Sequence, residues 1–98
     1  MNAVRLSARL VERDPLRYTP AGIPVLGVRL QHDSMQAEAG SQRRVELELA
    51  AIAMAEQALR LERVELGRGI AISGFLAPRR RNSRGLVLHV TGFEIDED

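Results

Sequence analysis

Apolar and polar residues alternate along the start of the chain. Every second position from 4 to 10 is Val, Leu or Ala, and arginine or serine stands between them. A period of two is typical of a strand with one buried face. The same period returns over residues 26–31 and from Arg43 to Leu49. These patterns predict three strands in the first half of the chain.

Stretches of other character separate or follow these strands. The prolines and glycine of residues 19–24 predict a turn, and the small polar residues 33–42, with Gly40, predict a long surface loop. Residues of high helix propensity predict a short helix over 53–61. Two further apolar runs, 69–78 and 86–95, predict a closing hairpin, with a bulge or bend at Gly92 in the second run.

The order strand, strand, strand, helix, strand, strand predicts an all-β fold. It fits a five-stranded OB-fold, a Greek-key barrel with a short helix between strands three and four, in which barrel closure removes open sheet edges. A ferredoxin-like fold would need a helix after the first strand, and the TPAGIP turn at residues 19–24 excludes one there. A length of 98 residues is that of one domain, so residues 1–98 are expected to form a single OB-fold domain.

Composition narrows the class of protein. Apolar residues make up 45% of the chain and aromatic residues only 3%, so aliphatic side chains must fill the core. The absence of cysteine excludes disulfides, thiolate metal sites and cysteine nucleophiles. Arginine and acid interrupt the N-terminal segment before it reaches signal-peptide length, and no run of 18 apolar residues occurs. These features predict a soluble, cytoplasmic protein.

Charge is unevenly distributed, although the net charge is only +1. All 14 basic residues are arginine, and residues 94–98 form an acidic tail. An arginine-only composition also follows from a GC-rich genome, so the positions of the arginines must decide whether they have a function. Arginine presents a planar, permanently charged fork that suits phosphate groups and stacks on bases.

The arginines concentrate where OB-folds bind oligonucleotides, on the face of strands two and three and on the loops beside it. Strand parity directs Arg29 and Arg44 outward on that face. Tyr18 is expected either to cap the barrel or to stack on a base. The candidate nucleic-acid-binding residues are Arg17, Tyr18, Arg29, Arg44, Arg79, Arg80, Arg81 and Arg84.

Nothing in the sequence indicates an enzyme, a metal site or a cofactor. His32, Asp33 and Ser34 are neighbours on an extended chain and point in alternating directions, so they cannot form a triad. His32 and His89 lack the companions of a metal site and are expected to be structural or surface residues.

Four short stretches carry a family resemblance: PLR at 15–17, GIP at 22–24, QAEAG at 36–40 and VLH at 87–89. On them, the chain resembles the primosomal replication protein N (PriB) family, relatives of bacterial single-stranded DNA-binding proteins. The resemblance implies an OB-fold homodimer that binds single-stranded DNA and cooperates with the PriA helicase and DnaT in restarting stalled replication. It also implies that the family's basic loop falls on Arg79, Arg80, Arg81 and Arg84, and its basic first loop near Arg17 and Tyr18.

Two positions depart from that family pattern. Asp33 stands where relatives carry a basic residue, and Glu46 is the nearest match to their tryptophan. The departures predict a DNA footprint displaced toward the arginine loop, or weaker binding. Two other functions stay open: a general single-strand or RNA-binding module, and a protein-interaction subunit that docks its basic loop on an acidic partner.

Overall fold

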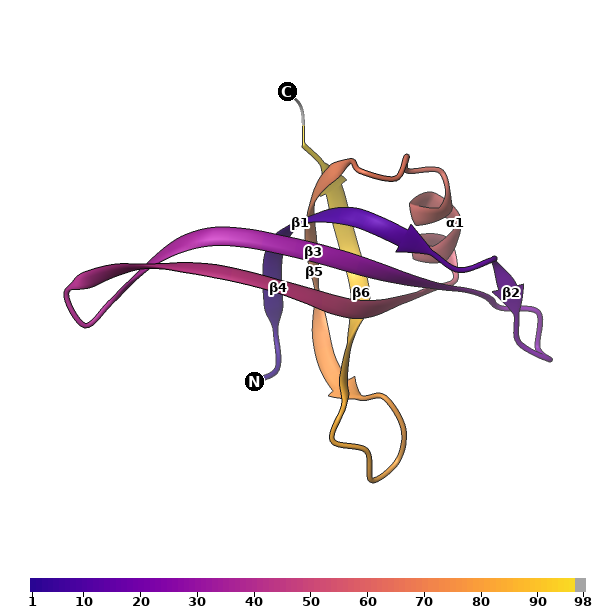
Figure 1. Cartoon of the computed structure of the whole chain (residues 1–98). Helices are drawn as coiled ribbons and strands as arrows, with labels where there is room; N and C mark the ends of the chain where they lie inside the picture. Colours follow the sequence, from indigo (N-terminus) through magenta and orange to yellow (C-terminus); the bar gives the residue numbers. More distant parts are fainter. Residues whose placement is uncertain (97–98) are drawn as a thin grey trace.

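Figure 1 shows the computed structural model, which describes residues 1–96. Six strands and one helix follow one another along the chain. They are β1 (Val4–Arg13), β2 (Arg17–Tyr18), β3 (Pro24–Glu38), β4 (Ser41–Met54), α1 (Glu56–Glu62), β5 (Gly69–Pro78) and β6 (Leu86–Ile95). The predicted acidic tail begins within β6 and continues past Asp96 to residues 97–98, which lie outside the described residues.

Five of the strands close into a barrel, in the order β1-β5-β6-β4-β3, with β1 also paired to β3. β1 serves both ends of this order because it bends: residues 4–9 pair with β5, and residues 9–13 pair with β3. A register shift between Leu10 and Glu12 marks the bend. Among the described strands, β4 and β6 alone pair in parallel. The predicted five-stranded OB-fold is confirmed, and β2 is a two-residue addition at the edge of β3.

Aliphatic side chains from every barrel strand fill the core. Leu10, Leu30, Ile72 and Leu88 are completely buried, and burying one such side chain stabilises the fold by roughly 1.5–3 kcal/mol. The helix α1 packs against this core through Ala58 and Leu61. It begins three residues later than predicted, because Ala53 and Met54 still pair with β3 as part of β4.

The predicted loop over residues 33–42 is wrong. β3 and β4 continue as one long antiparallel hairpin, from Val25 opposite Met54 to Glu38 opposite Ser41. The two turn residues, Ala39 and Gly40, have φ values of 52° and 81°, as tight hairpin turns require. This arm projects to one side of the barrel (Figure 1). Because its outer part has no core to cover, its side chains are mostly polar on both faces, apart from the exposed Met35 and Ala37, and lack the alternation that identifies a half-buried strand.

The β5–β6 hairpin contains the irregularity expected near Gly92. Ser73 pairs with Gly92 and Gly74 with Val90, so Thr91 is an extra residue in β6. At Gly74 the chains approach so closely that an added Cβ would lie 1.9 Å from the carbonyl oxygen of His89. Within residues 1–96, no helix has the length and apolar character needed to cross a membrane.

Candidate nucleic-acid interface

An open groove of about 390 Å³ crosses the barrel between the β1–β3 connection and the β5–β6 loop. Its floor comes from the first part of β3, the last part of β4 and the start of β6. Its borders carry charge: Arg17 on β2, Arg29 on β3 and Arg79 after β5, with Glu12 and Asp14 at the end of β1. The described residues that line the groove are Glu12, Asp14, Arg17, Gly27, Val28, Arg29, Ala50, Ala51, Ile52, Arg79, Val87 and His89. The fold therefore brings together three predicted site residues that are far apart in sequence.

Short-range backbone bonds hold the first border of the groove. Arg17 and Tyr18 pair with Val25 and Pro24, and the Thr19 amide donates to the Ile23 carbonyl at 2.9 Å. Tyr18 is 60% exposed, so its ring does not cap the barrel. The ring is therefore free to contact a ligand beside Arg17.

The second border is the loop of residues 79–85. Its ends are joined by the amide of Arg79, which donates to the carbonyl of Gly85 at 2.8 Å, and Ser83 accepts a side-chain bond from the Gly85 amide at 3.0 Å. Backbone atoms and a serine thus shape the loop. The side chains of Arg79, Arg80, Arg81 and Arg84 are left exposed.

The outer face of β3 and β4 presents a ladder of side chains that leads from the groove into the arm. Arg29 lies at its groove end, with Glu12 and Glu48 oxygens 3.9 and 3.7 Å from its guanidinium. Both distances exceed that of a hydrogen bond. Arg29 therefore has nearby carboxylates but no direct bond to either.

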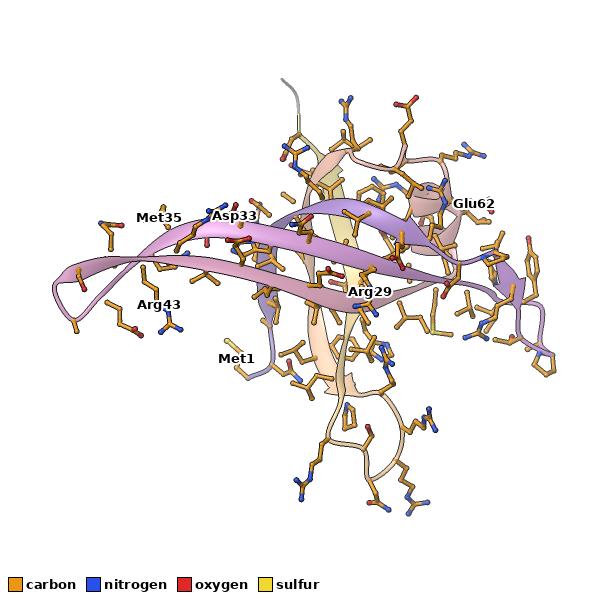
Figure 2. All side chains as sticks on the ribbon, viewed as in Figure 1. Met1, Arg29, Asp33, Met35, Arg43 and Glu62 are labelled. Carbon is orange, nitrogen blue, oxygen red and sulfur yellow. The ribbon has the colours of Figure 1, made fainter. Side chains whose placement is uncertain are left out.

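Arg44, farther along this ladder, is held much more closely. It donates to both Asp33 carboxylate oxygens, at 3.2 and 2.7 Å, and its Nε lies 3.2 Å from Glu46 (Figure 2 labels Arg29 and Asp33). The hydrogen bond to Arg44 holds the pKa of Asp33 below its ordinary value, and the same bond raises the pKa of Arg44. Arg44 thus differs from the other predicted site residues, because two carboxylates already neutralise it.

The intramolecular partners of the arginines separate them into groups. Arg29, Arg43 and Arg44 form ion pairs. Four more arginines donate to backbone carbonyls: Arg9, Arg13, Arg60 and Arg68. Within residues 1–96 the remaining arginines have neither kind of partner, and they are Arg5, Arg17, Arg63, Arg79, Arg80, Arg81 and Arg84. Five of these seven lie on the two borders of the groove, so the unpartnered positive charge is concentrated there.

An aromatic pair beside the groove was missed from the sequence. Phe75 and His89 face each other across β5 and β6, with ring centroids 4.9 Å apart and planes within 7°. Phe75 is 39% exposed and His89 lines the groove. Their pairing belongs to the register that runs from Gly74 opposite Val90 to Pro78 opposite Leu86, on the loop side of the extra Thr91. The sequence predicts an irregularity near Gly92 but not this register. A stacked pair of rings at the edge of a cationic groove offers a surface on which a base can stack.

Other side chains with possible chemistry have structural roles. His32 is buried, and its ring nitrogens lie 2.6 Å from the Ser7 carbonyl oxygen and 2.7 Å from Ser34 Oγ. Its expected structural role is confirmed. Arg60 lies over the Phe93 ring at 4.6 Å and forms no ion pair with Glu56 among the described residues. In the described part of the chain, no three His, Cys, Asp or Glu side chains cluster as metal ligands would.

Comparison with known proteins places the chain among single-strand binding proteins. Residues 2–92 match the family described as "Another single-strand binding protein family". The chain is 46% identical to the replication restart protein PriB of Bordetella pertussis over an alignment of 90 residues. The alignment covers 92% of this chain and 84% of that protein.

Solved structures agree with this match. PriB from Ralstonia solanacearum superposes with a TM-score of 0.89 at 36% identity, covering 99% of both chains. The single-stranded DNA-binding protein of Thermus aquaticus gives a TM-score of 0.78 at 25% identity, covering 99% of this chain and 50% of that one.

Proposed function

The chain belongs to the PriB family of single-strand binding proteins, and on that premise we propose that it binds single-stranded DNA during replication restart. The proposed role is binding without catalysis, in the cytoplasm. The relatives' name, replication restart protein, supports the biological setting. The groove and its borders support the mode of binding.

One observation carries the proposal: the arginines without intramolecular partners gather on the two borders of one groove. A groove bordered by cationic loops attracts a polyanion and follows its backbone without reading base edges. Arg17, Arg29 and Arg79 outnumber the two groove carboxylates, Glu12 and Asp14, even before the rest of the loop is added. The attraction of a single strand's phosphates to these arginines therefore exceeds their repulsion by the two carboxylates.

Each part of the groove has a distinct proposed task. Arg17 and the loop arginines Arg79, Arg80, Arg81 and Arg84 contact phosphates. Arg29 reaches a phosphate by turning away from Glu12 and Glu48, which costs no hydrogen bond. Tyr18 and the Phe75–His89 pair stack on bases. A stacked base contributes about 1–3 kcal/mol.

Fluorescence anisotropy with labelled oligo-dT tests the proposal. Oligo-dT should bind and should be displaced by unlabelled single-stranded DNA much better than by duplex DNA. Preferential displacement by oligo-rU would instead identify an RNA-binding module. No anisotropy change at low salt would contradict nucleic-acid binding altogether.

A protein-interaction subunit is the second candidate function, because an exposed arginine loop also fits an acidic protein surface. Capture of the partner in the absence of DNA, together with no binding of oligo-dT, would favour it. By family resemblance, the PriA helicase and DnaT are the proposed protein partners in replication restart.

A homodimer is also part of the proposal. Within residues 1–96, residues 4–8 of β1 pair with β5 alone, and an open strand edge favours addition of another strand. A second copy of this chain is the proposed occupant, as the resemblance implies. Light scattering should give twice the monomer mass, and the mass of a monomer would remove this part of the proposal.

A further inference from the structure

We propose that Asp33, Arg44 and Glu46 form a carboxylate barrier that ends the nucleic-acid path on the β3–β4 face. The inference rests on the proposed function, and it specifies the ligand of the groove as a short segment of single strand. The barrier consists of these three residues and lies at the base of the arm.

The order of the cross-strand residue pairs on the outer face of β3 and β4, called rungs below, supports this barrier. Starting from the groove, the paired positions are Arg29 with Ala50, Gln31 with Glu48, Asp33 with Glu46, and Met35 with Arg44. Every rung between the two arginines therefore carries at least one carboxylate. A strand that leaves the groove along this face meets negative charge before it reaches Arg44.

The geometry of Arg44 explains why it does not offset that charge. Its guanidinium donates two hydrogen bonds to Asp33 and lies 3.2 Å from Glu46. One cation between two carboxylates leaves a net charge of −1. Asp33 occupies the Nε–Nη2 edge of Arg44 in a bidentate pair, the strongest arrangement of this kind, so a phosphate can take that edge only by displacing the carboxylate. A phosphate that approaches the remaining Nη1 donors meets a cluster whose net charge is negative. Arg29 makes no such bond, so the two outward arginines of the face differ in availability.

The barrier lies too far from the groove to weaken the binding of a short strand there. Asp33 is four residues beyond Arg29 on β3, which corresponds to about 13 Å along a strand. The Debye length at physiological ionic strength is about 8 Å. A short strand in the groove is therefore largely screened from the barrier, whereas a longer one that continues along the face is not.

The test compares labelled dT oligomers of about 6 and about 20 nucleotides, lengths chosen around the site sizes of OB-folds. The variant Asp33→Asn/Glu46→Gln removes both barrier carboxylates and releases Arg44. We expect it to bind the long oligomer about 3- to 10-fold more tightly, with a log K against log salt slope steeper by about 0.7 for one added phosphate contact. Its affinity for the short oligomer should stay within about twofold of wild type.

Two controls separate a released arginine from a simple change in net charge. Glu62→Gln/Glu65→Gln removes two exposed carboxylates in and after α1, and Figure 2 shows Glu62 well apart from Asp33. It should leave binding of both oligomers nearly unchanged. Adding Arg44→Gln to the barrier variant should abolish the steeper salt slope, because the gain requires that guanidinium.

The outcomes distinguish the barrier from the function on which it rests. If the wild-type protein binds no single strand, the proposed function is wrong and the barrier with it. If wild type binds, but the barrier variant gains nothing on the long oligomer, gains equally on both lengths or gains no more than the α1 control, the barrier alone is wrong. Thermal melting of each variant verifies that binding is measured on folded protein.

Discussion

Replacing three loop arginines gives the most quantitative prediction. The variant Arg79→Ala/Arg80→Ala/Arg81→Ala should weaken single-strand binding and flatten its salt dependence, while the fold stays intact. The loop is shaped by backbone bonds and Ser83, not by these side chains. The free energy of unfolding should therefore change by no more than about 0.5 kcal/mol.

The number of phosphates sets the size of the effect. If wild type neutralises about four phosphates, log K falls against log salt with a slope of roughly −3, and affinity drops about 50-fold between 50 and 200 mM salt. The variant removes three of the six arginines assigned to phosphates, which leaves about two phosphates neutralised, so the slope should be about −1.4 and the same change in salt should cost only about sevenfold. Anisotropy titrations at four or more salt concentrations measure both slopes.

A matched comparison makes this prediction specific to the loop. Arg80→Ala and Arg63→Ala each remove one exposed arginine that lacks a partner among residues 1–96, the first beside the groove and the second at the end of α1. Only the loop variant should flatten the slope. Equal slopes for the two variants, or a flat wild-type dependence, would refute the electrostatic reasoning. Unfolding of the triple variant would show that the loop arginines have a structural role.

Three further variants probe other parts of the structure. Phe75→Ala should weaken binding of oligo-dT by about 1–3 kcal/mol at every salt concentration without changing the slope, if its ring supports a base; an unchanged affinity would exclude stacking there. Gly74→Ala should lower the free energy of unfolding in urea by about 1–3 kcal/mol, because its Cβ would collide with the His89 carbonyl. Gly92→Ala is the control, since its Cβ would meet nothing within 4 Å, and it should lower the free energy of unfolding much less. Equal losses of stability would contradict the close approach at Gly74. The hydrogen bond from Arg44 lowers the pKa of Asp33 in the folded protein. The stability that this bond contributes is therefore present at pH values above the pKa of Asp33 in the unfolded chain, and it is lost as the pH falls through the lower pKa of the folded protein. Carboxyl NMR titration should show the Asp33 pKa rising in Arg44→Gln, and no rise would contradict the pairing.

The barrel was predictable because its core imposes a period of two on the strands that cover it. Leu26, Val28 and Leu30 are all buried, as their spacing predicted. That signal fails where a strand leaves the core. Residues 33–38 and 41–42 continue the β3–β4 ladder with mostly polar residues on both faces, and composition alone therefore suggested a loop.

The arginines that line the candidate groove were predictable from the sequence, but the pairings of the side chains around them were not. The fold unites Arg17, Arg29 and Arg79 in one groove, as barrel topology suggested. The neutralisation of Arg44 depends on the cross-strand register that sets Asp33 opposite Glu46. That register follows from the length and turn of a hairpin that the sequence did not disclose. The Phe75–His89 stack was hidden for a similar reason, since its pairing follows from the register of β5 and β6 beside the 79–85 loop.

Direct observation of the arginine side chains during binding tests the central claim most closely. Adding oligo-dT to isotopically labelled protein should shift the guanidinium Nε–Hε NMR signals of Arg17, Arg29 and the loop arginines at 79–81 and 84. The signals of Arg5 and Arg63 should stay in place. Shifts centred on Arg5 and Arg63, with the groove signals unmoved, would contradict binding in the groove.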